Sequence, residues 1–254
     1  MVRGLNIFRQ RFEKFSDNYI IIGGAACDAV LSDSGLTPRA TKDFDIILNV
    51  EALTTEFVAH FWDFIREGNY QKREQETQKR NAFRFQNPTE ITFPTQIELF
   101  CRKPDALILP DDIHITPIPA DEGLSSLSAI LLDDNYYNFT LKHSEISEGV
   151  HYANIEALIC LKAYAYLSNK QLKENGIHVD SVNIEKHKND IFRLLPLLSA
   201  NTVIELPDTI LSDMRKFAHT IADNLPTEQM LTQAGYENLA PKEVYNDLLS
   251  KFKL

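Results

Sequence analysis

The 254-residue sequence has few of the features that mark secreted or membrane proteins. Its three cysteines, Cys27, Cys101 and Cys160, lie far apart and form no CxxC pair. This pattern excludes a disulfide scaffold and a zinc ribbon, and it fits a reducing cytoplasm. No apolar run is long enough to cross a bilayer, and residues 1–16 contain no continuous apolar stretch. We therefore expect a soluble, cytoplasmic protein with no signal peptide and no membrane partner.

Basic residues are also few. Lysine and arginine total 26 against 36 aspartates and glutamates, which gives a formal net charge of −10. A field of this sign disfavours tight, nonspecific binding of nucleic acid but leaves room for a local basic site. The one candidate patch, interleaved with Glu74 and Glu76, contacts a substrate or is a solvated loop of mixed charge. Its members are Lys72, Arg73, Lys79, Arg80 and Arg84.

The pattern of apolar residues changes along the chain. Up to about residue 150, short β-branched runs alternate with helical patterns, and after Asn154 only helical periods follow. Hydrophobic residues make up 44% of the chain, enough for a sizeable core. We predict an α+β fold with a mixed sheet flanked by helices in residues 1–150, followed by a helical C-terminal domain in residues 151–254.

The individual elements follow from local periodicity. Strands are predicted over residues 19–22, 43–50, 83–85 and 95–101, and residues 127–132 and 136–141 add sheet or a hairpin around Asp133-Asp134-Asn135. Helices are predicted over residues 5–15, 25–31, 53–67, 155–167, 184–198, 209–222 and 241–252. Residues 104–123 are rich in proline and aspartate, so we predict a loop with at most short strands.

A strand that ends in two glycines is the first feature that indicates chemistry. The strand of residues 19–22 is followed at once by Gly23-Gly24, ahead of the helix predicted over residues 25–31. Glycines at a strand-to-helix turn let backbone N–H groups approach a phosphate at the helix N-terminus. A glycine pair taken alone is usually only a turn.

Two carboxylates follow on the next predicted strand. Alternation along that strand puts Asp43 and Asp45 on one face, with roughly 7 Å between their Cα atoms. Carboxylates so placed can hold hard divalent cations such as Mg²⁺, which also takes ligands from substrate phosphates. Glu98, on the strand predicted over residues 95–101, is either a third metal ligand or an ordinary outward carboxylate.

The order of these features resembles a known family. Gly23-Gly24 followed by Arg39-Ala40-Thr41-Lys42-Asp43-Phe44-Asp45 is similar to the signature of the DNA polymerase β-like nucleotidyltransferases, and most of all to the AbiEii branch. Residues 125–132, 156–163 and 186–194 look like the family's later motifs. The resemblance spans most of residues 19–200 and implies a nucleotidyltransferase-type mixed sheet followed by helices.

The family's activity sets the expected function. AbiEii-like proteins are the toxins of bacterial toxin–antitoxin and abortive-infection systems, and the superfamily transfers a nucleotide from an NTP with the help of Mg²⁺. The resemblance therefore implies NMP transfer to an acceptor. In related toxins this acceptor is the 3′ end of tRNA, so RNA is the expected acceptor here. A cognate antitoxin protein is the implied partner.

The resemblance also distributes roles among residues. Those implied in catalysis are Asp43, Asp45, Lys162 and Asp190, those in nucleotide binding are Gly23, Gly24, Arg39, Thr41 and Lys188, and the metal ligands are Asp43, Asp45 and Glu98. Lys162 and Lys188 each interrupt an apolar helical stripe, so each snorkels to solvent or points into the cleft between the two regions. The family's second lysine falls on Lys188 or Asn189. Asp190 orients a lysine or acts as base. His187, beside it, has a role in helix packing or acts as a general base, and we favour packing.

Two departures from the family pattern keep other functions open. Many nucleotidyltransferases place Ser or Thr after the glycine pair, where this chain has Ala25 and Ala26, and their third carboxylate is often Asp rather than Glu98. Transfer to a protein or small-molecule hydroxyl is a second hypothesis, which the acidic composition mildly favours. A degenerate fold that binds a nucleotide or a partner protein without turnover is a third.

Overall fold

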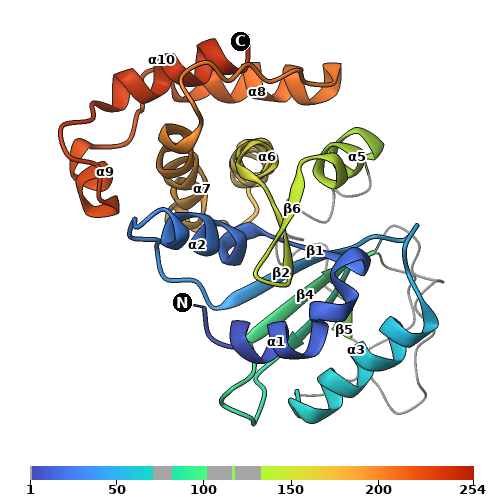
Figure 1. Ribbon diagram of the computed structural model, residues 1–254. Coiled ribbons are helices and arrows are strands. Elements are labelled where there is room, and N and C mark those ends of the chain that lie inside the picture. Colours follow the sequence, from blue (N-terminus) through green and yellow to red (C-terminus); the bar gives the residue numbers. More distant parts are fainter. Residues whose placement is uncertain (1, 71–81, 102–115, 118–132) are drawn as a thin grey trace.

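The computed structural model describes residues 2–70, 82–101, 116–117 and 133–254 (Figure 1). Within these ranges it confirms the α+β class, with helices on both faces of a mixed sheet. Several predictions lie outside the described residues: the patch members Lys72, Arg73, Lys79 and Arg80, the motif block 125–132, the strand 127–132 and all of the segment 104–123 except residues 116–117. Those two residues form a short strand, as that prediction allowed.

The described strands form one seven-stranded sheet in the order β5-β3-β4-β2-β1-β7-β6. Their bounds are β1 Tyr19–Ile22, β2 Asp43–Leu48, β3 Ala82–Gln86, β4 Gln96–Phe100, β5 Thr116–Pro117, β6 Ser144–Ser147 and β7 Val150–Ala153. The pairs β2–β4 and β1–β7 are parallel and the others antiparallel. All four residues of β1 are buried, as the β-branched run predicts for a central strand.

Two groups of helices cover the sheet. The helices before residue 150 are α1 Leu5–Phe12, the 3₁₀ helix Glu13–Asn18, α2 Gly23–Asp33, α3 Thr55–Glu67 and α5 Asp134–Lys142. Those after residue 150 are α6 Ile155–Glu174, α7 Ser181–Leu194, the 3₁₀ turn Leu195–Leu197, α8 Asp208–Ile221, α9 Glu228–Ala234 and α10 Pro241–Lys251. Helices α1 and α3 lie on one face of the sheet, while α2, α6 and α7 lie on the other, with α8 and α10 beyond them (Figure 1).

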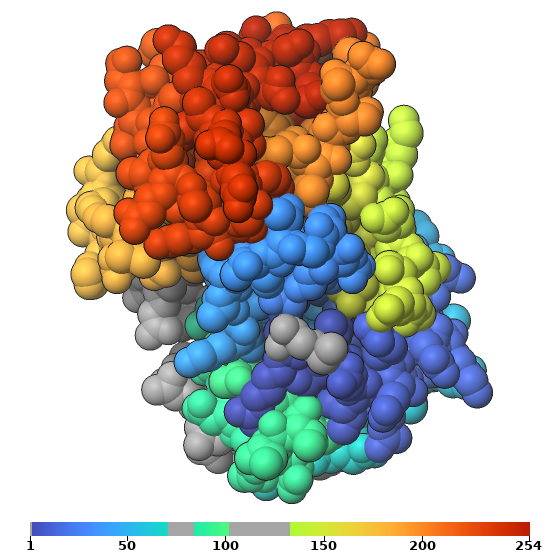
Figure 2. Space-filling view, turned by 60° about the vertical axis from the view of Figure 1, so that its left-hand side comes forward, coloured from blue at the N-terminus to red at the C-terminus, as the bar shows by residue number. Residues whose placement is uncertain are grey.

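The two halves of the chain share one core. In Figure 2 the C-terminal helices, in orange and red, lie directly against the N-terminal part, in blue. The backbone N–H of Thr37 donates to the carbonyl of Ala234 at 3.0 Å, which ties the chain after α2 to the end of α9. Buried apolar side chains from both halves form a single cluster. The segments before and after residue 150 are therefore packed into one continuous core.

The strand or hairpin predicted over residues 136–141 is wrong, because this segment is helix α5. The side chain of Asp133 caps the helix by accepting hydrogen bonds from the backbone N–H groups of Asn135 and Tyr136. Tyr136 and Tyr137 are buried, and the Tyr136 ring packs edge-on against Tyr164 of α6. Aromatic residues favour strands in general, but here the cap and the contact with α6 decide.

The sheet also extends beyond the predicted boundary at residue 150. A hairpin of β6 and β7 turns at Glu148-Gly149, both with positive φ (48° and 77°), and β7 pairs with β1 through Ile21 and Tyr152. The boundary therefore falls within a strand of the sheet, and α6 begins at Ile155 after its cap Asn154. The division into two domains stays a prediction. This hairpin and helix α9 were not predicted from the sequence.

Candidate active site

The Gly23-Gly24 turn lies directly against Asp45, a predicted metal ligand, and Thr41, a predicted nucleotide-binding residue. Helix α2 begins at Gly23, immediately after β1 and two residues earlier than predicted. Gly23 has φ +67°, and a Cβ atom on it would lie 1.9 Å from Oδ2 of Asp45. A Cβ atom on Gly24 would lie 2.5 Å from Oγ1 of Thr41. A side chain at Gly23 would displace Asp45 and would need a left-handed backbone, and one at Gly24 would displace Thr41. The helix N-terminus therefore lies next to Asp45 and Thr41.

Sheet register brings the carboxylates together. Asp45 pairs with Ile22 of β1 on one side and with Glu98 of β4 on the other. Asp43 lies two residues earlier and shares the face of Asp45. Burial, followed by the negative charges of Glu98 and Asp43, raises the pKa of Asp45 to about 8. A carboxylate pair with oxygen-only donors and an excess of negative charge fits a hard divalent cation such as Mg²⁺.

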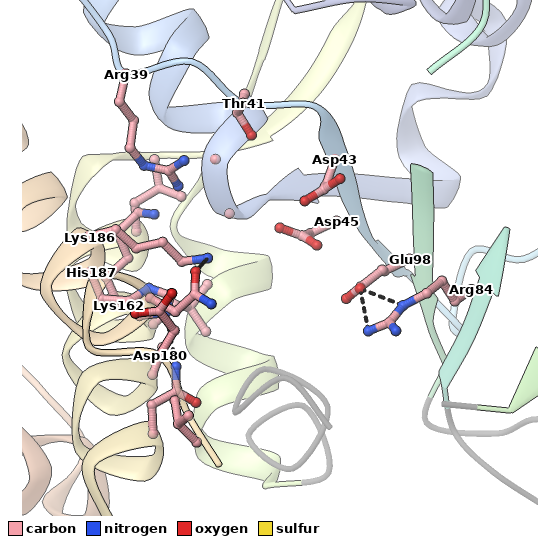
Figure 3. A pocket seen from close by; sticks show the side chains of 18 of the residues that line it. Arg39, Thr41, Asp43, Asp45, Arg84, Glu98, Lys162, Asp180, Lys186 and His187 are labelled. Atoms are coloured by element: carbon pink, nitrogen blue, oxygen red, sulfur yellow. Dashed lines mark hydrogen bonds and ion pairs between the residues drawn. The ribbon is translucent and has the colours of Figure 1, made fainter. Parts of the chain in front are cut away.

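Glu98 lies opposite Asp45 in the sheet and is held by two neighbouring side chains. Its Oε1 accepts hydrogen bonds from Nε and Nη2 of Arg84, each at 2.9 Å (Figure 3). The same oxygen also accepts from Nε2 of Gln96 at 2.9 Å. The described residues contain no group of three or more His, Cys, Asp or Glu side chains placed to hold a metal ion. Arg84 and Gln96 bind one oxygen of Glu98, so its role as a third metal ligand stays a prediction beside Asp43 and Asp45.

Asp190 organises the basic side of the site. Its carboxylate accepts from Nε of Arg39 at 3.1 and 3.0 Å, from Nζ of Lys162 at 2.7 Å and from Nη1 of Arg193 at 3.2 Å. Burial alone would raise the pKa of Asp190, but the charges of Lys162 and Arg39 outweigh it and lower the pKa to about 2. Of the two predicted roles, the geometry favours orienting the lysine, since this carboxylate is a weak base. Lys162 lies in the cleft rather than in solvent.

Lys188 is not where it was predicted to be. Its ammonium donates to the carbonyl of Asn224 at 2.7 Å and pairs with Glu185, and among the described residues it does not line the pocket. Lys186 of the same helix does line the pocket. A helix turns by about 100° per residue, so Lys186 and Lys188, two residues apart on α7, face in nearly opposite directions. The placement of Lys188 in the cleft is wrong, and Lys186 takes that place.

Lys186 is a residue that the sequence reasoning missed. Its Nζ lies 3.2 Å from the amide oxygen of Asn183. Burial, then the positive charges of Arg39 and Lys162, lower its pKa. The spacing held a usable signal, because Lys186 and Asp190 are four residues apart and so share one face of the helix.

His187 also lines the pocket, beside Asn169 of α6. Its Nε2 lies 3.3 Å from Nδ2 of Asn169, and its buried Nδ1 has no hydrogen-bond partner within the described part of the chain. Burial, followed by the charges of Lys162 and Lys186, lowers the pKa of His187 well below its usual value. The imidazole is therefore neutral at neutral pH, and it contributes a polar wall rather than a charge.

These groups surround one pocket of about 320 Å³ between the sheet and helices α6 and α7 (Figure 3). Its acidic wall comes from β2 and its basic wall from α6, α7 and the segment before β2. The predicted residues that line it are Gly23, Gly24, Arg39, Thr41, Asp43, Asp45, Glu98 and Lys162. A pocket with a cation site on one wall and an anion site on the other suits a metal-bound polyphosphate.

No family model matches this chain, and no curated protein matches it. Among the helices of residues 2–70 and 133–254, none is both long and apolar enough to cross a membrane. The geometry of the pocket and the motif resemblance are therefore the support for a function.

Proposed function

We propose that the protein is a nucleotidyltransferase that moves an NMP from an NTP to an acceptor hydroxyl. The observation that carries this proposal is the contact of the glycine turn with Asp45. It places a helix N-terminus, which attracts anions, beside two carboxylates, which attract a divalent cation. A nucleoside triphosphate with its divalent cation offers both charges in one molecule.

The phosphates of the NTP have a basic wall to bind. The backbone N–H groups of the Gly23-Gly24 turn contact the β- and γ-phosphates, and Lys162 and Arg39, held by Asp190, face them across the pocket. Lys186 adds a cation, and its ammonium donates to the neutral amide oxygen of Asn183 at 3.2 Å. These residues compensate the charge that moves onto the leaving pyrophosphate.

Asp43 and Asp45 would hold Mg²⁺, which supplies charge neutralisation at the triphosphate and lowers the pKa of a bound hydroxyl. The acceptor oxygen attacks the α-phosphorus, the bond from that phosphorus to the bridging oxygen breaks, and pyrophosphate leaves while the hydroxyl proton passes to solvent. The residues of this chain align the reacting groups, and such positioning is the main contribution to phosphoryl-type transfer.

Thr41 bears on the alternative of a degenerate, inactive fold. That hypothesis rests on Ala25 and Ala26, where many nucleotidyltransferases have a hydroxyl. Both alanines are buried beneath the turn. The hydroxyl of Thr41 instead lies against Gly24, so a hydroxyl is available at the same turn from another segment. This contact supports an active enzyme.

The acceptor and the biological role rest on the family resemblance. We propose RNA, with a tRNA 3′ end as the first candidate, and a toxin role that requires a cognate antitoxin. Protein and small-molecule hydroxyls are the competing acceptors.

The purified chain should be incubated with Mg²⁺, each α-labelled NTP in turn, and total bacterial RNA and protein. We expect label on RNA, and none when Asp43 and Asp45 are both replaced by Asn. Label on protein would change the acceptor, and no label in any fraction would contradict the proposal. Asp63→Asn is the matched control, because Asp63 forms an exposed ion pair with Arg66 on α3.

A further inference from the structure

The pocket continues beyond the phosphate-binding cations, between helices α6 and α7. Lys162 and Asn169 both line it from α6 and lie seven residues apart, nearly two turns or about 10 Å along one face of the helix. The ribose and base of a nucleotide whose phosphates lie at Lys162 can span this length. This part of the pocket, which we call the α6–α7 slot, is lined by the uncharged residues Asn169, Val179, Asn183 and His187.

The amide of Asn169 offers a hydrogen-bonding edge inside the slot. Within the described part of the chain its side chain makes one hydrogen bond, in which Nδ2 lies 3.3 Å from Nε2 of His187. The side chain is only half-buried and lines the pocket, so its Oδ1 and its second N–H are open to a ligand. An amide edge of this kind presents an acceptor and a donor side by side, as the edge of a nucleobase does.

His187 fixes the direction of this amide. Because burial and the charges of Lys162 and Lys186 keep the imidazole neutral, its Nε2 can accept the hydrogen bond from Nδ2 of Asn169. The acceptor Oδ1 of Asn169 is then directed away from the ring. The other ring nitrogen, Nδ1, is buried without a partner among the residues that the structure describes. Such an atom is rare in native proteins and fits a site that a ligand completes.

The charge of the slot favours a nucleoside over a chain of RNA. Asp180, the exposed cap of α7, lines this part of the pocket and lies on the helical wall with His187, across from Asp43 and Asp45 (Figure 3). A carboxylate there repels a phosphate backbone but not an uncharged base. Val179 adds apolar surface, and apolar walls with a few placed polar groups are typical of small-molecule sites.

Resting on the proposed function, we propose that the α6–α7 slot binds the base of the NTP. Asn169 selects among bases through its free amide edge, and His187 is the positioning residue that orients Asn169. The slot therefore decides which NTP is used, while the glycine turn and the cations bind the phosphates that all NTPs share.

The test measures binding, without turnover, of each of the four NTPs and of tripolyphosphate, which has the phosphates but no base, all with Mg²⁺. We expect Asn169→Leu to weaken binding of the preferred NTP about tenfold or more, because a two-point amide contact contributes discrimination of this size. Tripolyphosphate binding should stay unchanged. The matched control is Gln171→Leu, since Gln171 is an exposed amide two residues along α6 and faces nearly the opposite way.

Two variants of His187 test its role as a positioning residue. His187→Phe removes the acceptor for the Asn169 amide and should reduce the preference among the four NTPs. His187→Gln supplies an amide oxygen that can accept the same hydrogen bond, so it should restore that preference. Equal preferences in the two variants would overturn the positioning role.

The outcomes separate this inference from the proposed function. No loss of NTP binding in Asn169→Leu, or an equal loss for tripolyphosphate, would overturn the inference and leave nucleotidyl transfer intact. Weaker RNA binding with unchanged NTP binding would assign the slot to the acceptor and overturn it too. Binding of neither NTP nor tripolyphosphate by the unmodified protein would overturn the proposed function itself.

If Asn169→Leu does not fold, crystals of the unmodified protein with a bromine-substituted base in the preferred NTP decide. An anomalous peak beside Asn169 supports the inference, and a peak outside the α6–α7 slot overturns it.

Discussion

The ammonium of Lys162 lies 2.7 Å from Oδ2 of Asp190, and the two side chains are only 4% and 1% exposed. The residues come from neighbouring helices, α6 and α7, and the same carboxylate also holds Arg39 from the segment before β2. One buried acid therefore fixes two of the cations that face the proposed triphosphate. Removing it should affect the fold and the site together.

Asp190→Asn should lower the free energy of unfolding by about 3–5 kcal/mol, because it leaves the ammonium of Lys162 buried without its counter-charge. Urea unfolding followed by circular dichroism measures this loss. The control is Asp63→Asn, whose exposed ion pair with Arg66 should contribute about 1 kcal/mol or less. Equal losses in the two variants would contradict the central position given to Asp190.

The stability contributed by Asp190 should depend on pH in the acid range. Its pKa falls from an ordinary carboxyl value to about 2 in the folded chain, because Lys162 and Arg39 outweigh the cost of burial. The folded state therefore binds this proton less readily than the unfolded state, so protonation favours unfolding. The difference in unfolding free energy between the unmodified protein and Asp190→Asn should have its full value above about pH 4. It should shrink as the pH falls toward 2. A difference that grows on acidification would have the wrong sign.

Two lysines of helix α7 should give opposite results when each is replaced by methionine. Lys186→Met removes a pocket cation, and we expect NTP binding to weaken about tenfold or more, with unfolding free energy changed by about 0.5 kcal/mol at most. Lys188→Met leaves the carbonyl of Asn224 without its donor and should cost about 1–3 kcal/mol of stability. Its folded form should bind NTP normally. Fluorescent-nucleotide titration and urea unfolding of both variants make the comparison, and weaker NTP binding by Lys188→Met alone would reverse the assignment.

Gly23→Ala should damage the site well beyond the cost of its backbone conformation. Its new Cβ would lie 1.9 Å from Oδ2 of Asp45, so the carboxylate must move and cation binding should be lost. Gly176→Ala is the matched control, since Gly176 also has positive φ (+84°) and nothing within 4 Å of the added atom. That control should lose only about 1–2 kcal/mol of stability and keep cation binding. Mn²⁺ titration and thermal unfolding of both variants test the contrast, which fails if Gly23→Ala binds the cation normally.

Much of the acidic wall could be predicted from local sequence. Alternation on one strand is enough to place Asp43 and Asp45 on a common face, and the glycine pair marks the turn beside them. The ion pair of Glu98 with Arg84 could not be predicted, because it depends on the register between β3 and β4, which places Arg84 opposite Glu98. Register depends on how the apolar faces of both strands and their connection match, so neither strand taken alone reveals it.

The basic wall shows a different limit. An interrupted apolar stripe identified both Lys162 and Lys188 as unusual, and both are buried, but only Lys162 faces the pocket. The ammonium of Lys188 donates to the carbonyl of Asn224, in the segment after α8, and sequence periodicity does not distinguish this environment from that of Lys162. Lys186 lies four residues before Asp190 and so shares its face of α7, which points to Lys186 as the pocket lysine instead. The helix α5 was missed for a related reason, since its aromatic residues favour strands until the Asp133 cap and the contact with α6 are considered.

The most direct test of nucleotidyl transfer compares NTPs labelled at the α- and at the γ-phosphate, with the acceptor fraction that takes up label. The account predicts that α-label moves to the acceptor, that γ-label leaves as pyrophosphate, and that Asp45→Asn abolishes the transfer while its circular dichroism spectrum stays that of the folded chain. Transfer of γ-label, or full α-label transfer by Asp45→Asn, would contradict it.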